Sequence, residues 1–105
     1  MNLTITRDDT DATTTLTLVG SVDLVSRGEL VSAGTDALGA DRALVLDMAG
    51  VEFLDSLGIG ALVELDRVAR SRGRSLTVSA RSARVQRVLE VTGLDAAWAD
   101  PATVG

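Results

Sequence analysis

A carboxylate and a hydroxyl stand together near the middle of the chain, where Asp55 and Ser56 come just before an apolar, helix-like run. At a helix start, free backbone amides and the helix dipole favour an added negative charge. A phosphate on the Ser56 hydroxyl is such a charge, so the pair is compatible with a phosphorylation switch. Asp and Ser are also ordinary helix caps, and local physics alone favours a cap without further function.

The composition removes most other kinds of catalytic site. Cysteine, histidine and lysine are absent from the 105 residues, which excludes disulfides, thiolate nucleophiles, Ser-His-Asp triads, histidine zinc sites and Schiff bases. An enzyme would have to use Asp23, Asp47 and Asp55 as a metal-binding or phospho-aspartyl cluster, and the missing lysine argues against both. We therefore expect a binding protein rather than an enzyme, with no metal and no cofactor.

Charge is distributed unevenly along a chain whose net charge is −5, because residues 67–87 carry seven arginines and no acid. The cluster from Arg67 to Arg87 could bind phosphate groups, or it could neutralise the acidic remainder through helix pairs such as Asp66 with Arg70. With no lysine and only two aromatic residues, direct nucleic-acid binding is not expected, and an acidic patch on a protein partner is favoured. The role of the cluster is left open.

The hydrophobic pattern predicts the elements that position these residues. Two alternating segments, 2–7 and 13–19, predict a hairpin, and the apolar run 43–48 predicts a central strand that is covered on both faces and parallel to the second strand. A loop is expected from Ala49 to Asp55, and a fourth strand is expected at Leu76–Ala80. No stretch reaches the roughly 20 apolar residues that span a bilayer, so we expect a soluble, cytoplasmic protein without membrane insertion.

Three helices are predicted between and after these strands. A capping box of Ser26 and Glu29 opens the first helix, which closes at Gly39. The second covers about residues 57–71, with Val63 among its inward-facing residues, and the third begins at a Ser82 cap and ends at Gly93. Leu94 and Trp98 are expected to fold back over the edge of the core. The order β-β-α-β-α-β-α implies an α/β fold with a single mixed β-sheet of four to five strands and packed helices.

In such a sheet, functional groups collect where the carboxyl ends of parallel strands meet the starts of the following helices. Gly20-Ser21-Val22-Asp23 follows the second strand, and Val51 to Gly60, VEFLDSLGIG, follows the third. The second segment resembles the signature loop of STAS domains, specifically of stand-alone bacterial anti-sigma factor antagonists, which reads apolar-Asp-Ser-(Ser/Thr)-Gly-apolar-Gly. The first segment is similar to the family's Gly-x-apolar-Asp turn, and residues 85–94 resemble its last helix with a Thr/Ser-Gly-Leu ending.

The resemblance extends from about residue 3 to residue 98 and implies one STAS domain over residues 1–105. It implies an anti-sigma factor antagonist that binds an anti-sigma factor, a serine kinase with an ATP-binding fold, and so releases a sigma factor. The partner-binding residues that the motifs carry over are Gly20, Ser21, Asp23, Asp55, Ser56, Leu57 and Gly58. We expect a monomer or weak dimer. An interaction subunit of a transporter or of a stress-signalling complex is the alternative function.

One position departs from the family pattern. The family's usual phosphate acceptor is the hydroxyl residue directly before the glycine, and that position is Leu57 in this chain. The phosphate could move to Ser56, the chain could be a constitutive antagonist, or its binding role could never have used phosphate. We favour loss or alteration of the switch. Leu57 itself could anchor a partner or turn inward as a hydrophobic staple.

Overall fold

Four strands form one mixed sheet in the order β1-β2-β3-β4, and three helices pack against it. The computed structural model describes residues 2–99. The elements follow in the order β1 (Leu3–Asp9), β2 (Thr13–Val22), α1 (Arg27–Leu38), β3 (Ala43–Leu54), α2 (Ser56–Ser71), β4 (Leu76–Arg81) and α3 (Ala83–Thr92). The predicted fold class and the predicted order of elements are confirmed.

The pairing of the strands follows from the lengths of their connections. β1 and β2 are joined by a short turn and pair antiparallel, whereas β2, β3 and β4 are joined through helices and pair parallel. Every second side chain is buried over residues 13–18 of β2 and 43–48 of β3, as in Leu16 and Leu18 of β2 and Leu44 and Leu46 of β3. β1 therefore forms the antiparallel edge of the sheet, as the sequence predicted.

Two expectations about the third strand are wrong. β3 does not end before a loop at Ala49 but continues to Leu54, because register shifts in the pairing keep it beside β2 as far as the Val22–Leu54 pair. It is also not covered on both faces, since Val45 and Asp47 are only half-buried. The apolar run of residues 43–48 arises because apolar residues occupy both faces of the strand, although helices do not cover both faces.

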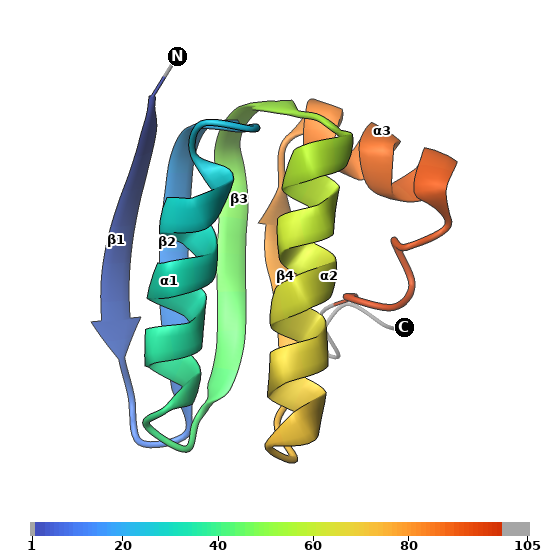
Figure 1. Ribbon diagram of the computed structural model, residues 1–105. Coiled ribbons are helices and arrows are strands. Elements are labelled where there is room, and N and C mark those ends of the chain that lie inside the picture. Colours follow the sequence, from blue (N-terminus) through green and yellow to red (C-terminus); the bar gives the residue numbers. More distant parts are fainter. Residues whose placement is uncertain (1, 100–105) are drawn as a thin grey trace.

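The helices α1 and α2 lie side by side against one face of the sheet, and both begin at the same end of it (Figure 1). Gly34 of α1 permits their close approach, because a Cβ atom there would lie 2.5 Å from Cδ2 of Leu65 in α2. Leu30, Leu62 and Leu65 are fully buried in this layer. Val63 is exposed, so its predicted inward orientation is wrong.

The third helix and the segment after it lie at the β4 end of the sheet (Figure 1). Ser82 caps α3 by accepting a hydrogen bond from the Val85 N–H at 3.2 Å, and Gly93 ends it with a left-handed φ of 76°, both as predicted. The chain then returns along β4, where the Val78 N–H donates to the Trp98 carbonyl oxygen at 2.9 Å and the Trp98 side chain is buried. None of the helices within residues 2–99 is long and apolar enough to cross a membrane.

Candidate functional site

The carboxyl ends of β2, β3 and β4 and the starts of the three helices meet at one edge of the molecule, at the top of Figure 1. Val22 and Leu54 are neighbours in the β2–β3 register, so Asp23 and Asp55 each follow one member of this pair. The Asp55 N–H also donates to the Val22 carbonyl oxygen at 3.4 Å. The two motif segments that the sequence singled out, more than 25 residues apart along the chain, therefore form one continuous edge.

Asp55 caps α2 with its side chain. Its Oδ1 atom accepts hydrogen bonds from the Leu57 N–H at 3.0 Å and from the Gly58 N–H at 2.9 Å, while its own backbone is extended at φ −108° and ψ −174°. The carboxylate thus accepts hydrogen bonds from two backbone amides that would otherwise have no partner at the helix start. The capping role that the local physics favoured is present, and Ser56, the first residue of the helix, is left exposed beside it.

Asp23 organises the turn into α1. Its Oδ1 atom accepts hydrogen bonds from the Val25 N–H at 3.0 Å and the Ser26 N–H at 3.1 Å. These contacts lower the pKa of Asp23; the Ser26 backbone N–H contributes most, and burial opposes it. The Asp23 carboxylate is therefore held ionised in a fixed turn.

The predicted capping box of Ser26 and Glu29 is wrong. Ser26 has a helical backbone and its side chain makes no cap hydrogen bond. Its hydroxyl is buried and instead donates to the Ser21 carbonyl oxygen at 2.7 Å, while it accepts from the Asp23 N–H at 3.0 Å. Asp23, three residues earlier, accepts the first amides of the turn, so Ser26 is free to tie the turn back to the end of β2.

Three of the residues carried over by the motifs shape the backbone rather than the surface. Gly20 has a φ of 116°, and a Cβ atom there would lie 1.9 Å from the Asn2 carbonyl oxygen. Ser21 is buried, and a Cβ atom on Gly58 would lie 2.5 Å from the Val22 carbonyl oxygen. Gly20 therefore allows the close approach of Asn2 to β2, and Gly58 allows the close approach of α2 to the end of β2.

Three apolar side chains are exposed at this edge. Leu57 is 38% exposed, so it does not turn fully inward as a staple. Leu24 and Val25 are 61% and 86% exposed in the turn held by Asp23. The sequence analysis missed these two residues, although an apolar pair inside a turn, outside any helical or strand period, is a signal that could have identified them.

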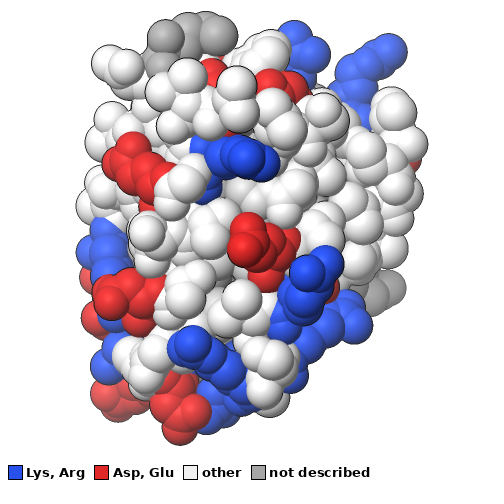
Figure 2. All heavy atoms as spheres, in the orientation of Figure 1, with Lys and Arg blue, Asp and Glu red and all other residues white. Residues whose placement is uncertain are grey.

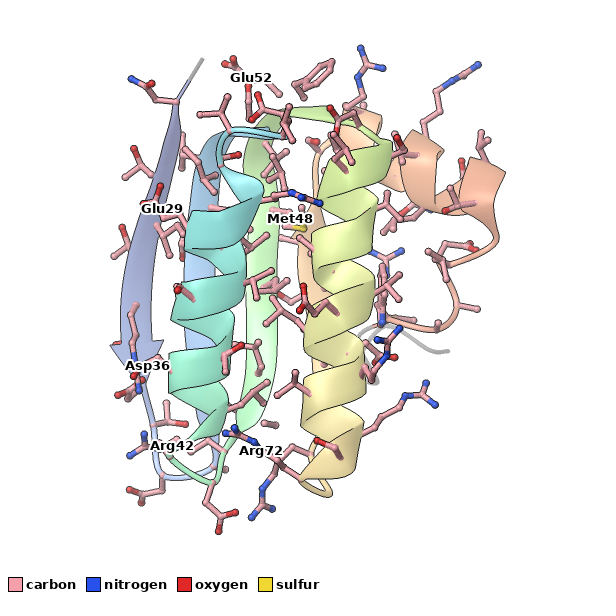
Figure 3. All side chains as sticks on the ribbon, viewed as in Figure 1. Glu29, Asp36, Arg42, Met48, Glu52 and Arg72 are labelled. Atoms are coloured by element: carbon pink, nitrogen blue, oxygen red, sulfur yellow. The ribbon has the colours of Figure 1, made fainter. Side chains whose placement is uncertain are left out.

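The start of α3 completes the edge. The Ser82 hydroxyl donates to the Val51 carbonyl oxygen at 2.7 Å and so fixes α3 to β3. Two residues after Ser82, the Arg84 guanidinium lies 5.9 Å from the centroid of the Phe53 ring. Figure 2 shows basic side chains projecting at this end of the molecule, and Glu52 lies at the same edge in Figure 3.

The alternative of a three-aspartate cluster does not match the geometry. Asp47 lies within β3, and its Oδ1 atom accepts from the Ala49 N–H at 3.1 Å. Within the described part of the chain, no group of three or more acidic side chains is placed to hold a metal ion. Asp23 and Asp55 are brought to one edge, and Asp47 is not.

Most of the arginine cluster has a structural role. Arg70 pairs with Asp66 at 3.0 Å, as predicted, and Arg74 pairs with Asp41. Arg81 donates to Gln86 Oε1 at 3.1 Å and to the Asp95 carbonyl oxygen at 3.0 Å, which anchors the chain after α3. Arg72 lies beside Gly39 at the carboxyl end of α1, where the helix dipole favours a cation (Figure 3). The cluster is therefore not one continuous phosphate-binding face.

Comparison with known proteins agrees with the motifs. A family model described as "Mlab, STAS domain" matches residues 5–100. An anti-sigma factor antagonist from Mycobacterium paratuberculosis superimposes with a TM-score of 0.81 and 28% identity over 92% of this chain and 83% of that chain. SpoIIAA, an anti-sigma factor antagonist of Bacillus, superimposes in its unphosphorylated form with a TM-score of 0.79 and 19% identity over 92% of this chain and 86% of that chain.

Proposed function

The chain belongs to the STAS domain family, and we propose that it is an anti-sigma factor antagonist, which binds an anti-sigma factor and thereby releases a sigma factor. Its strongest support is the start of α2, where Asp55 caps the helix and presents Leu57 to solvent beside the Asp23 turn. A rigid backbone that displays apolar side chains is a common basis of protein recognition. The 28% identity to the mycobacterial antagonist supports the same role.

The seven motif residues divide into two roles in this proposal. Gly20, Ser21 and Gly58 set the backbone, with Ser21 and Gly58 buried, and Asp23 and Asp55 hold the two turns through their carboxylates. Ser56 and Leu57 are left to contact the partner directly. The partner that we propose is a serine kinase with an ATP-binding fold, so the nucleotide belongs to the partner.

We further propose that the phosphorylation switch is lost or altered. Leu57 has no hydroxyl at the family's acceptor position. A phosphate on Ser56 would lie next to the Asp55 carboxylate, which already occupies the amides of Leu57 and Gly58. Like charges at short range oppose each other, and the helix amides are not free to compensate the phosphate. Ser56 is thus a poorer site for a stable phosphate than an uncapped helix start would be.

Phosphorylation can be tested with the cognate kinase. The purified chain is incubated with this anti-sigma kinase and ATP, and its intact mass and fragment masses are measured. We expect no added phosphate, or phosphate on Ser56 alone. Phosphate on a threonine elsewhere would overturn the assignment of residues 51–60 to the family's signature loop.

Binding can be tested by affinity capture from the host's own lysate with ADP present, followed by direct titration of the purified pair. Recovery of an anti-sigma kinase that binds the wild-type chain stoichiometrically is the expected result. The alternative function, an interaction subunit of a transporter or a stress-signalling complex, is compatible with the same exposed apolar edge and with a missing acceptor. Recovery of transporter subunits or of a large signalling assembly would retain the fold and reject the sigma-factor role.

A further inference from the structure

Three exposed apolar side chains lie at the edge that carries the motifs. Leu24 and Val25 project from the turn between β2 and α1, and Leu57 projects from the first turn of α2. The hydrogen bonds to Asp23 and Asp55 hold both segments, so docking a partner here would cost little backbone entropy. Large apolar side chains on a fixed, solvent-facing backbone indicate a contact surface rather than a packing role.

Two arginines lie at the starts of helices at this edge, where the helix dipole disfavours a positive charge. Arg27 is the first residue of α1, and Arg84 lies in the first turn of α3. A cation at the positive end of a helix is unfavourable, whereas Arg70 at the end of α2 follows the dipole and pairs with Asp66. The helix dipole therefore does not account for Arg27 or Arg84.

These arginines also lack acidic partners. Among residues 2–99, Arg27, Arg84 and Arg87 make no ion pair, and the Arg84 guanidinium lies near the Phe53 ring. Arg87 lies three residues after Arg84 and so shares its side of α3. Neither Asp23 nor Asp55 forms an ion pair with these arginines; both carboxylates accept backbone amides and keep their charge. Glu29, in the first turn of α1, and Glu52 are further acids at this edge, and neither forms an ion pair within the described chain.

In Figure 1, α1 and the body of α3 lie on opposite sides of α2, and each of these two helices carries arginine in its first turn. On the α1 side, Arg27 lines a groove of about 790 Å³ between α1 and α2, together with Gly28, Gly60 and Glu64. On the other side, Arg84 and Arg87 are exposed on α3. An apolar centre with a charged rim is the usual arrangement of a protein interface.

We propose that Leu24, Val25 and Leu57 form the centre of the docking surface for the anti-sigma factor, and that the partner places carboxylates opposite Arg27, Arg84 and Arg87. This inference rests on the proposed function and adds the chemistry of the partner's surface: an apolar patch bordered by acidic side chains. The apolar centre supplies most of the affinity, and the arginines increase the association rate and fix the orientation.

The test is a titration of the wild-type chain and four variants with the purified anti-sigma factor recovered with the wild-type chain, held with ADP. Val25→Ser is compared with Val91→Ser, because Val91 is 79% exposed near the far end of α3. The double variant Arg84→Glu/Arg87→Glu is compared with Arg67→Glu, which reverses an exposed arginine without an ion pair late in α2. Circular dichroism and thermal unfolding confirm that each variant is folded.

We expect Val25→Ser to weaken binding by about tenfold or more, chiefly through faster dissociation. The arginine double variant should slow association and lose most of the salt dependence of the association rate. Val91→Ser and Arg67→Glu should stay within about twofold of wild type. If the wild-type chain binds and all four variants match it, the docking surface is wrong and the proposed function stands. If the wild-type chain binds no anti-sigma factor, both are wrong.

Discussion

Gly58 and Gly60 lie two residues apart in α2 and offer a matched test of how the edge is assembled. A Cβ atom on Gly58 would lie 2.5 Å from the Val22 carbonyl oxygen and 2.7 Å from Leu54 Cδ1. A Cβ atom on Gly60 would meet nothing within 4 Å. The same substitution, glycine to alanine, should therefore have opposite effects at the two positions.

The magnitudes follow from helix propensity and from packing. Alanine is favoured over glycine by about 1 kcal/mol in a helix interior, and Gly60→Ala should gain most of this. Gly58→Ala gains less, because it lies in the first turn, and it adds a contact to a backbone oxygen that cannot rotate away. Overpacking of this kind costs typically 1–3 kcal/mol. We expect Gly58→Ala to destabilise the fold by about 1–2 kcal/mol, net of its propensity gain.

Urea and thermal unfolding of both variants measure these changes in the free energy of unfolding. In a domain of this size, each kcal/mol changes the Tm by about 4–8 °C. Gly58→Ala should also weaken partner binding, since the Val22 carbonyl oxygen that must shift is the acceptor for the Asp55 N–H. Gly60→Ala should leave the edge unchanged. Equal stabilisation by the two substitutions would refute the close contact between α2 and the end of β2.

Three further substitutions test the edge itself. Leu57→Asp should abolish detectable binding of the anti-sigma factor while leaving the Tm within a few degrees of wild type, since Leu57 is partly exposed; unchanged affinity in a titration would contradict its place in the interface. Asp55→Ala should cost about 1 kcal/mol in urea unfolding through loss of the α2 cap, and Asp55→Asn should cost much less; equal losses would show that the cap is not the cause. The pKa of Asp23 in the folded chain is below its ordinary value of 3.8, so its carboxylate stabilises the fold above that value and the contribution is lost as the pH falls through the folded pKa. Unfolding measured from pH 6 to pH 2 should show a smaller acid-induced loss for Asp23→Asn than for wild type, and identical pH profiles would contradict the hydrogen-bonded turn.

The order of elements could be predicted because each boundary has a local signal. Gly93 ends α3 in the left-handed conformation, and Ser82 caps it with its hydroxyl, so both ends of that helix are determined by their own residues. The parallel arrangement of β2, β3 and β4 follows from crossovers long enough to contain helices. Such features depend little on distant parts of the chain.

The errors occur where two local signals compete or where tertiary pairing decides. The sequence around Ser26 is that of a helix cap, but its hydroxyl donates to the Ser21 carbonyl oxygen, and Asp23 accepts the amides of the turn before α1. Gly50 and Glu52 interrupt the apolar pattern of β3, yet the strand continues because β2 provides its hydrogen-bond partners. Val63 and Val25 are apolar but exposed, and hydrophobicity alone cannot distinguish a contact surface from a core.

Two kinds of residue lie at the edge: those that the fold requires and those whose side chains the fold does not require. Asp23 and Asp55 make the turns through side-chain hydrogen bonds to backbone amides, and these bonds are indifferent to the side chains at positions 24, 25, 56 and 57. A change from a hydroxyl residue to leucine at position 57 therefore alters the surface without removing a cap or a core contact of the edge. A phosphorylation switch placed at such a position can be lost by one substitution while the domain keeps its stability, and the exposed leucine then adds apolar area to the proposed docking surface.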